Sequence, residues 1–122
     1  MNGKKKTLVL GASNNPSRYS YLATQRLRAH GHPVVAVGKK GGQVGDVSIQ
    51  KDHVAVSDVD TVTLYLNPQN QVEYYDYILE LQPKRIIFNP GTENDELIAK
   101  AKENNIEPII GCTLVMLSVG NY

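Results

Sequence analysis

The side chains best suited to chemistry in this chain are basic, and they gather near its start. The first forty residues contain eight Lys or Arg and no Asp or Glu, whereas residues 41–122 contain twelve acids and five bases. The net charge of +1 therefore divides into +8 and 5 − 12 = −7. Among the bases, Arg18, Lys39 and Lys40 follow short apolar segments, where they could donate hydrogen bonds to phosphate. This asymmetry predicts a site for an anionic ligand.

The segment after the first apolar run has the composition of a phosphate-binding turn. Residues 11–20 read Gly-Ala-Ser-Asn-Asn-Pro-Ser-Arg-Tyr-Ser. Gly11 permits a tight turn, and the absence of acids leaves the free N–H groups of a following helix available to a phosphate. Further donors are Ser13, Ser17, Arg18 and Ser20. The alternative interpretation is a loop and helix cap without a ligand.

The second apolar run is followed by lysines where an NAD site would carry an acid. Sites for NAD place Asp or Glu about 20 residues beyond the glycines, where the carboxylate binds the ribose hydroxyls. Here Gly38, Lys39, Lys40, Gly41 and Gly42 occupy this position. Lysine cannot accept a hydrogen bond from ribose, but it suits a ribose that carries a phosphate, as in NADP or coenzyme A (CoA). The sequence therefore disfavours NAD, although two solvated lysines remain an alternative.

Alternating apolar and helical patterns predict the sheet that would position these residues. Strands are predicted at 7–10, 34–37, 61–66, 85–88 and 107–110, with a weaker edge strand at 53–56. The runs are rich in β-branched residues and apolar on both faces, which is typical of a parallel sheet covered by helices.

Three helices are predicted between the strands. The first has an apolar stripe from Tyr19 to Leu27 and ends at Gly31. The second contains Val72, Tyr75 and Leu79, with Asn67 as N-cap and Pro68 at its first position. The third contains Leu97, Ile98 and Ala101 and is capped by Thr92. Residues 39–52 are rich in glycine and are predicted to form a loop.

This alternation predicts one α/β domain spanning residues 1–122, with a Rossmann-like, doubly wound parallel sheet. In such sheets the ligand lies outside the carboxyl ends of the strands, where the strand order reverses. The flanking loops would be residues 11–18 and 67–71.

Five motifs in order resemble the CoA-binding domain family, whose Rossmann-like domain also forms the N-terminus of the succinyl-CoA synthetase α subunit. The motifs are Gly11-Ala12-Ser13 with Pro16, Arg18, Ser20 and Tyr21; residues 38–42; Tyr65-Leu66-Asn67-Pro68; residues 88–94; and residues 112–117. The last two resemble a small stand-alone subgroup of the family. The resemblance spans essentially the whole chain.

The resemblance implies binding of CoA or an acyl-CoA. Residues 11–15 would surround the diphosphate, Lys39 would meet a nucleotide phosphate, and residues 66–68 would line the adenine or pantetheine path. The complete predicted binding set is Gly11, Ala12, Ser13, Asn14, Asn15, Arg18, Ser20, Gly38, Lys39, Lys40, Leu66, Asn67 and Pro68. The phosphorylated histidine of the synthetase lies in a second domain, and His30, His32 and His53 do not match it.

The sequence predicts neither catalytic residues nor a metal site, because nucleophile motifs and metal-spaced His or Cys clusters are absent from it. Cys112 follows a predicted buried strand and is interpreted as a small buried residue, or alternatively as a thiol that could pair with CoA. Tyr74 and Tyr77 are predicted to point outward from the second helix. They would form either a homodimer surface or ordinary helix packing, with the second interpretation favoured.

Together these features predict a cytoplasmic carrier, sensor or accessory module that binds a nucleotide-like small molecule. The single cysteine fits a reducing compartment, and the apolar runs are too short to span a membrane. Nucleic-acid binding is not expected, because the tyrosines lie among acids. The alternatives are an NADP-binding domain or reductase fragment, and a protein-interaction module that has lost its ligand.

Overall fold

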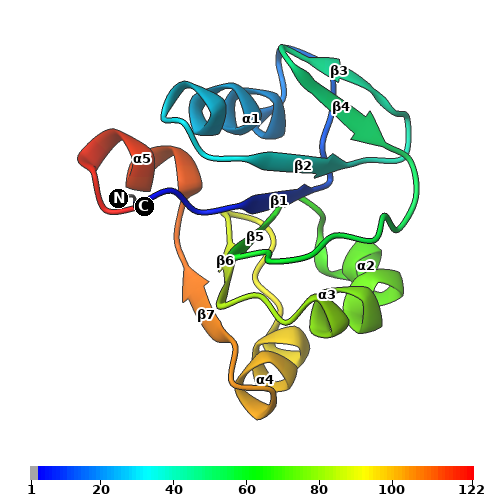
Figure 1. Ribbon diagram of the computed structural model, residues 1–122. Helices are drawn as coiled ribbons and strands as arrows, with labels where there is room; N and C mark the ends of the chain where they lie inside the picture. The colour runs from blue at the N-terminus through cyan, green and yellow to red at the C-terminus, as the bar shows by residue number, and fades with distance from the viewer. Residues whose placement is uncertain (1–2) are drawn as a thin grey trace.

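The elements of the chain alternate between strand and helix in the computed structural model, which describes residues 3–122 (Figure 1). The strands are β1 (Thr7–Leu10), β2 (Val34–Val37), β3 (Gly42–Val44), β4 (Val47–Gln50), β5 (Thr61–Leu64), β6 (Arg85–Phe88) and β7 (Glu107–Ile110). The helices are α1 (Tyr19–Ala29), α2 (Pro68–Gln71), the 3₁₀ helix η1 (Val72–Tyr74), α3 (Tyr75–Leu81), α4 (Asp95–Glu103) and α5 (Thr113–Val119).

The strands form one seven-stranded sheet in the order β3-β4-β2-β1-β5-β6-β7. All neighbours pair in parallel except β3 and β4, which form an antiparallel hairpin at one edge. The chain leaves β1 for β2 on one side and later returns to β5 on the other. The strand order therefore reverses between β1 and β5, and the predicted α/β class with a doubly wound sheet is confirmed.

Helices cover both faces of the sheet, with α1 and α5 on one face and α2, α3 and α4 on the other (Figure 1). Successive residues of β1 point to opposite faces, as the pleat requires. Leu8 and Leu10 belong to the core beneath α3 and α4, and Val9 belongs to the core beneath α1. All three are completely buried, so the central strand is a rigid base for the loop that follows it.

The predicted loop at residues 39–52 is instead the β3–β4 hairpin, and the predicted edge strand at 53–56 is irregular. Val44, Val47 and Ile49 are buried in the hairpin. Gly45 adopts a left-handed φ of 57° at its turn, a conformation that glycine accommodates without strain. The strand predicted at 61–66 ends at Leu64, which leaves Tyr65 and Leu66 in the loop at the sheet edge.

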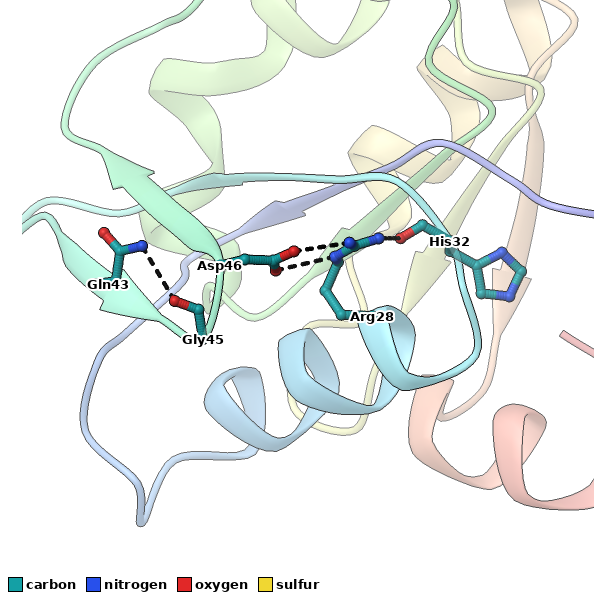
Figure 2. Close-up of polar contacts among 5 residues, drawn as sticks. All are labelled: Arg28, His32, Gln43, Gly45 and Asp46. Atoms are coloured by element: carbon teal, nitrogen blue, oxygen red, sulfur yellow. Dashed lines mark hydrogen bonds and ion pairs between the residues drawn. The ribbon is translucent and has the colours of Figure 1, made fainter.

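Arg28 connects the hairpin to helix α1 (Figure 2). Its Nε and Nη2 atoms donate to the Asp46 carboxylate at 3.0 and 2.8 Å, and its Nη1 donates to the His32 carbonyl at 3.0 Å. Gln43 closes the same turn by donating to the Gly45 carbonyl. The hairpin is thereby tied to the end of α1 and to the loop that enters β2.

Two features of the helices on the opposite face differ from the sequence predictions. Helix α4 is capped by Asn94, whose side-chain oxygen accepts from the N–H groups of Glu96 and Leu97, whereas the Thr92 hydroxyl donates to the Asn89 carbonyl. Tyr74 and Tyr77 do not point outward. Tyr74 is 5% exposed, and the Tyr77 hydroxyl donates to the Val54 carbonyl. Both tyrosines pack on His53, so they contribute to packing within the chain.

Candidate ligand-binding site

A cleft of about 780 Å³ opens at the carboxyl ends of β1 and β5, at the point where the strand order reverses. The loops after β1, β2, β5 and β6 contribute its walls. The lining residues are Gly11, Ala12, Ser13, Asn14, Asn15, Ser17, Arg18, Tyr19, Ser20, Lys39, Lys40, Tyr65, Leu66, Asn67, Pro90, Gly91 and Thr92. The cleft thus contains all of the predicted binding set except Gly38 and Pro68.

The loop after β1 turns at Gly11, where only glycine fits. Its φ is 93°, and an added Cβ would lie 2.9 Å from the carbonyl carbon of Tyr65. The N–H groups of Gly11 and Ala12 both donate to the Val37 carbonyl at 2.9 Å, which joins the turn to the end of β2. This close packing brings the loops after β1, β2 and β5 together.

The remainder of this loop is ordered by its own side chains. Ser13 Oγ accepts from the Asn15 N–H, and Asn15 Oδ1 accepts from the N–H and hydroxyl of Ser17. Helix α1 then begins without a side-chain cap and without an acid in its first turn. Its positive dipole end and free N–H groups therefore face the cleft without an internal counter-charge, which favours an anion.

The loop after β2 lies directly against the loop after β1. A Cβ on Gly38 would lie 2.1 Å from the Ala12 carbonyl oxygen, and one on Gly42 would lie 2.7 Å from the Asn14 side chain. Gly38 does not line the cleft itself, but its missing side chain allows the close approach that carries Lys39 and Lys40 into the lining.

Polar contacts fix the opposite wall. Asn67 caps α2 by accepting from the Asn70 N–H, as predicted, and Pro68 occupies the first turn of that helix. The buried Gln71 amide donates to the carbonyls of Leu66 and Thr92, both at 2.8 Å. Gln71 therefore joins the loop after β5 to the loop after β6.

Residues of the loop after β6 line the cleft but were not in the predicted binding set. Pro90, Gly91 and Thr92 follow a buried strand at the same sheet edge as the other loops, and this position is the signal that could have identified them. Tyr19 and Tyr65 were also missed. Tyr19 is 72% exposed at the start of α1, whereas burial raises the pKa of the Tyr65 hydroxyl.

The electrostatic character of the cleft is positive. Arg18, Lys39 and Lys40 line it, and none of the lining residues is Asp or Glu. The nearest acids act just outside the lining. Glu73 lies 3.4 Å from the Lys39 ammonium, and Glu93 accepts a hydrogen bond from the Gly91 N–H. The arrangement suits a ligand with several phosphates.

Cys112 and the three histidines do not line the cleft, although Cys112 lies near enough to the cleft residue Tyr65 to help raise the pKa of its hydroxyl. Cys112 is partly buried and precedes α5, and none of the four residues is among the lining residues. Strand β7, which precedes Cys112, is an edge strand with exposed Glu107 and Ile110, so the prediction of a buried strand there was wrong. In residues 3–122 no group of three or more His, Cys, Asp or Glu could hold a metal ion.

Comparison with known proteins agrees with this geometry. A family model described as CoA binding domain matches residues 5–118. The crystal structure of a protein described as uncharacterized is 57% identical and superposes with a TM-score of 0.96, covering 99% of this chain and 100% of the other. No curated protein matches the chain.

Two further solved structures share the fold at lower identity. A hypothetical protein from Pyrococcus horikoshii OT3 is 24% identical with a TM-score of 0.86, over 96% of this chain and 84% of the other. A protein from Thermus thermophilus is 20% identical with a TM-score of 0.85, over 98% of this chain and 91% of the other.

The part of the chain that the structure describes contains no helix long and apolar enough to cross a membrane.

Proposed function

The chain belongs to the family of CoA binding domains, and from this premise we propose that it binds coenzyme A or an acyl-CoA in the cleft at the carboxyl ends of β1 and β5. The observation that carries the proposal is a cleft with three cationic side chains, no acid in its lining and an uncapped helix start at its base. CoA carries a diphosphate and a 3′-phosphate, so its charge matches such a lining.

We assign each part of CoA to a part of the cleft. The diphosphate is assigned to the turn at Gly11–Asn15 and the start of α1, where backbone N–H groups and Arg18 can donate. The 3′-phosphate is assigned to Lys39 and Lys40. The uncharged adenine and pantetheine are assigned to the walls formed by Leu66, Asn67 and the loop after β6. Gly38 and Pro68 support the site by fixing the backbone beside it.

The proposed role is that of a carrier, sensor or accessory module in a reducing compartment such as the cytosol, formed by one domain over residues 1–122. The cleft holds cations, small residues and amides, which bind phosphates, and the proposal assigns no residue to bond making or breaking. In this role the protein acts by binding and releasing its ligand.

The proposal is tested by thermal denaturation with CoA, dephospho-CoA, NADP and NAD at equal concentrations. A ligand present at 100 times its dissociation constant stabilises the folded state by about 2.7 kcal/mol. CoA is expected to raise the melting temperature most, dephospho-CoA to raise it less, and NAD to leave it unchanged. An equal response to NADP and CoA would contradict the assignment, and no response to any of them would favour an interaction module.

Two lysine variants test whether the stabilisation by CoA arises in the cleft. Lys39→Gln is expected to reduce the response to CoA and to leave the response to dephospho-CoA nearly unchanged, because only CoA carries the 3′-phosphate. Lys102→Gln on the exposed side of α4 removes the same charge outside the cleft and serves as the matched control. If both variants weaken CoA equally, Lys39 has no specific role in reading the phosphate.

A further inference from the structure

Lys39, which lines the cleft, lies beside an acid of the neighbouring wall. Its ammonium nitrogen is 3.4 Å from Oε1 of Glu73 in η1, and the two side chains are 66% and 53% exposed. Lys39 comes from the loop after β2 and Glu73 from the helical segment after β5. The pair therefore joins two walls that lie on opposite sides of β1 in the sheet.

The position of Glu73 is fixed by buried neighbours on both sides. Gln71 is completely buried and donates to two loop carbonyls, and Tyr74 is 5% exposed with its ring 4.8 Å from that of His53. These buried side chains anchor the backbone of the segment that carries Glu73 beside the cleft. The Glu73 carboxylate lies against Lys39 from this anchored backbone, and its side chain remains accessible to solvent.

The other two cations of the cleft differ from Lys39. Within residues 3–122, neither Arg18 nor Lys40 lies in an ion pair, so Lys39 is the cleft cation with an internal counter-ion. A phosphate that approaches Lys39 meets the Glu73 carboxylate at the same nitrogen. It must either displace this carboxylate or accept repulsion from it.

We propose that Glu73 is a specificity-determining residue that competes with the ligand's ribose phosphate for Lys39. The inference rests on the proposed function and adds a regulating contact to that site. Glu73 occupies Lys39 when the ligand is absent and weakens binding of a phosphorylated ribose when the ligand is present. A ligand without this phosphate leaves the Lys39–Glu73 pair intact and does not sense Glu73.

The size of the effect follows from the exposure of both side chains. Interactions between exposed charges contribute up to about 1 kcal/mol, which corresponds to about fivefold in a dissociation constant. Glu73→Gln keeps the shape of the side chain and removes its charge. This change is expected to tighten CoA binding about two- to fivefold and to leave dephospho-CoA binding unchanged, so that discrimination between the two ligands rises.

The test is isothermal titration calorimetry of CoA and dephospho-CoA with the wild type, Glu73→Gln and the matched control Glu80→Gln. Glu80 is an exposed glutamate of α3 that lies in no ion pair within the described residues. Glu80→Gln removes the same charge from the same connection and is expected to change neither affinity. In a Lys39→Gln background, Glu73→Gln should no longer tighten CoA binding.

Three results would overturn the competition. Glu73→Gln could weaken CoA binding, which would show that Glu73 positions Lys39 for the phosphate. It could leave the CoA affinity unchanged, or it could change both ligands equally, as a loss of general negative charge would. If the wild type binds no CoA, the proposed function itself fails, and this outcome is separate from the three that concern Glu73 alone.

Discussion

His32 shows how burial controls a single titratable residue in this fold. It is 6% exposed, and its Nδ1 accepts a hydrogen bond from the Lys5 N–H at 2.9 Å. Burial, followed by the nearby charges of Lys4, Lys5, His30 and Arg85, lowers the pKa of His32 below its usual value. Between the folded and unfolded pKa values, the unfolded chain therefore binds a proton that the folded protein does not.

This difference predicts a loss of stability in mild acid. Because the unfolded state binds more protons below about pH 6.5, the free energy of unfolding should fall as the pH decreases from 7 to 5. One proton contributes at most about 1.4 kcal/mol per pH unit. His32→Asn keeps an acceptor for the Lys5 N–H and removes the titration, so it should flatten this slope in urea denaturation, whatever its stability at pH 7.

The control is His30→Asn, which changes an exposed histidine two residues away and leaves the buried imidazole of His32 in place, so it should reduce the slope less than His32→Asn does. Equal slopes for the wild type and His32→Asn would show that other groups cause the acid sensitivity.

Among the elements, the loop that joins β2 to the β3–β4 hairpin packs most closely against its neighbour, the loop after β1. An added Cβ on Gly38 would lie 2.1 Å from the Ala12 carbonyl oxygen, and this oxygen belongs to backbone that cannot rotate away. Gly38→Ala is therefore expected to destabilise the protein by about 1–3 kcal/mol through overpacking. It should also reduce the response to CoA, because Lys39 and Lys40 would be displaced from the loop after β1.

Gly111→Ala is the control for Gly38→Ala when the free energy of unfolding is measured by chemical denaturation. A Cβ there would meet its nearest atom at 3.6 Å, an ordinary contact, so the change is expected to be well tolerated. If Gly38→Ala is as stable as Gly111→Ala and binds CoA normally, the close packing of the two loops is not what positions the lysines.

The elements also show what could and could not be predicted from the sequence. The five apolar runs, helix α1 and the Asn67–Pro68 helix start have local signals that the structure follows. The hairpin has only a few alternating apolar residues among glycines, and packing against the sheet decides its conformation. Helix α5 was not predicted, because its sequence is apolar on nearly every side and gives no clear stripe.

A change of helix type explains the wrong orientation of Tyr74. The 3₁₀ helix η1 separates α2 from α3, so a 3.6-residue period counted through this segment loses its phase. Val72 is consequently 56% exposed and Tyr74 is buried, the reverse of the prediction.

In the cleft, the residues that were not predicted are Pro90, Gly91 and Thr92, which follow β6. They carry no charge that would indicate a phosphate site, and Thr92 had been interpreted as a helix cap.

At the scale of the whole molecule, the basic residues of the first forty positions lie at two ends of the sheet. Lys4 and Lys6 donate to the carbonyls of His30 and Ser57 away from the cleft, and Arg28 is paired with Asp46. Arg18, Lys39 and Lys40 gather at the carboxyl end of β1 and β5. Three of the eight bases in the first forty residues therefore lie at the opening of the cleft, where they would attract an anionic ligand.

The most direct test of the account is an NMR titration of the ¹⁵N-labelled protein with CoA. Binding in the cleft predicts saturable changes in the amide signals of Gly11–Ser20, Gly38–Lys40, Leu66, Asn67 and Gly91, with little change in α5. Changes confined to the opposite end of the sheet, near His30 and His32, or no changes at millimolar CoA, would contradict the assignment of this cleft to CoA.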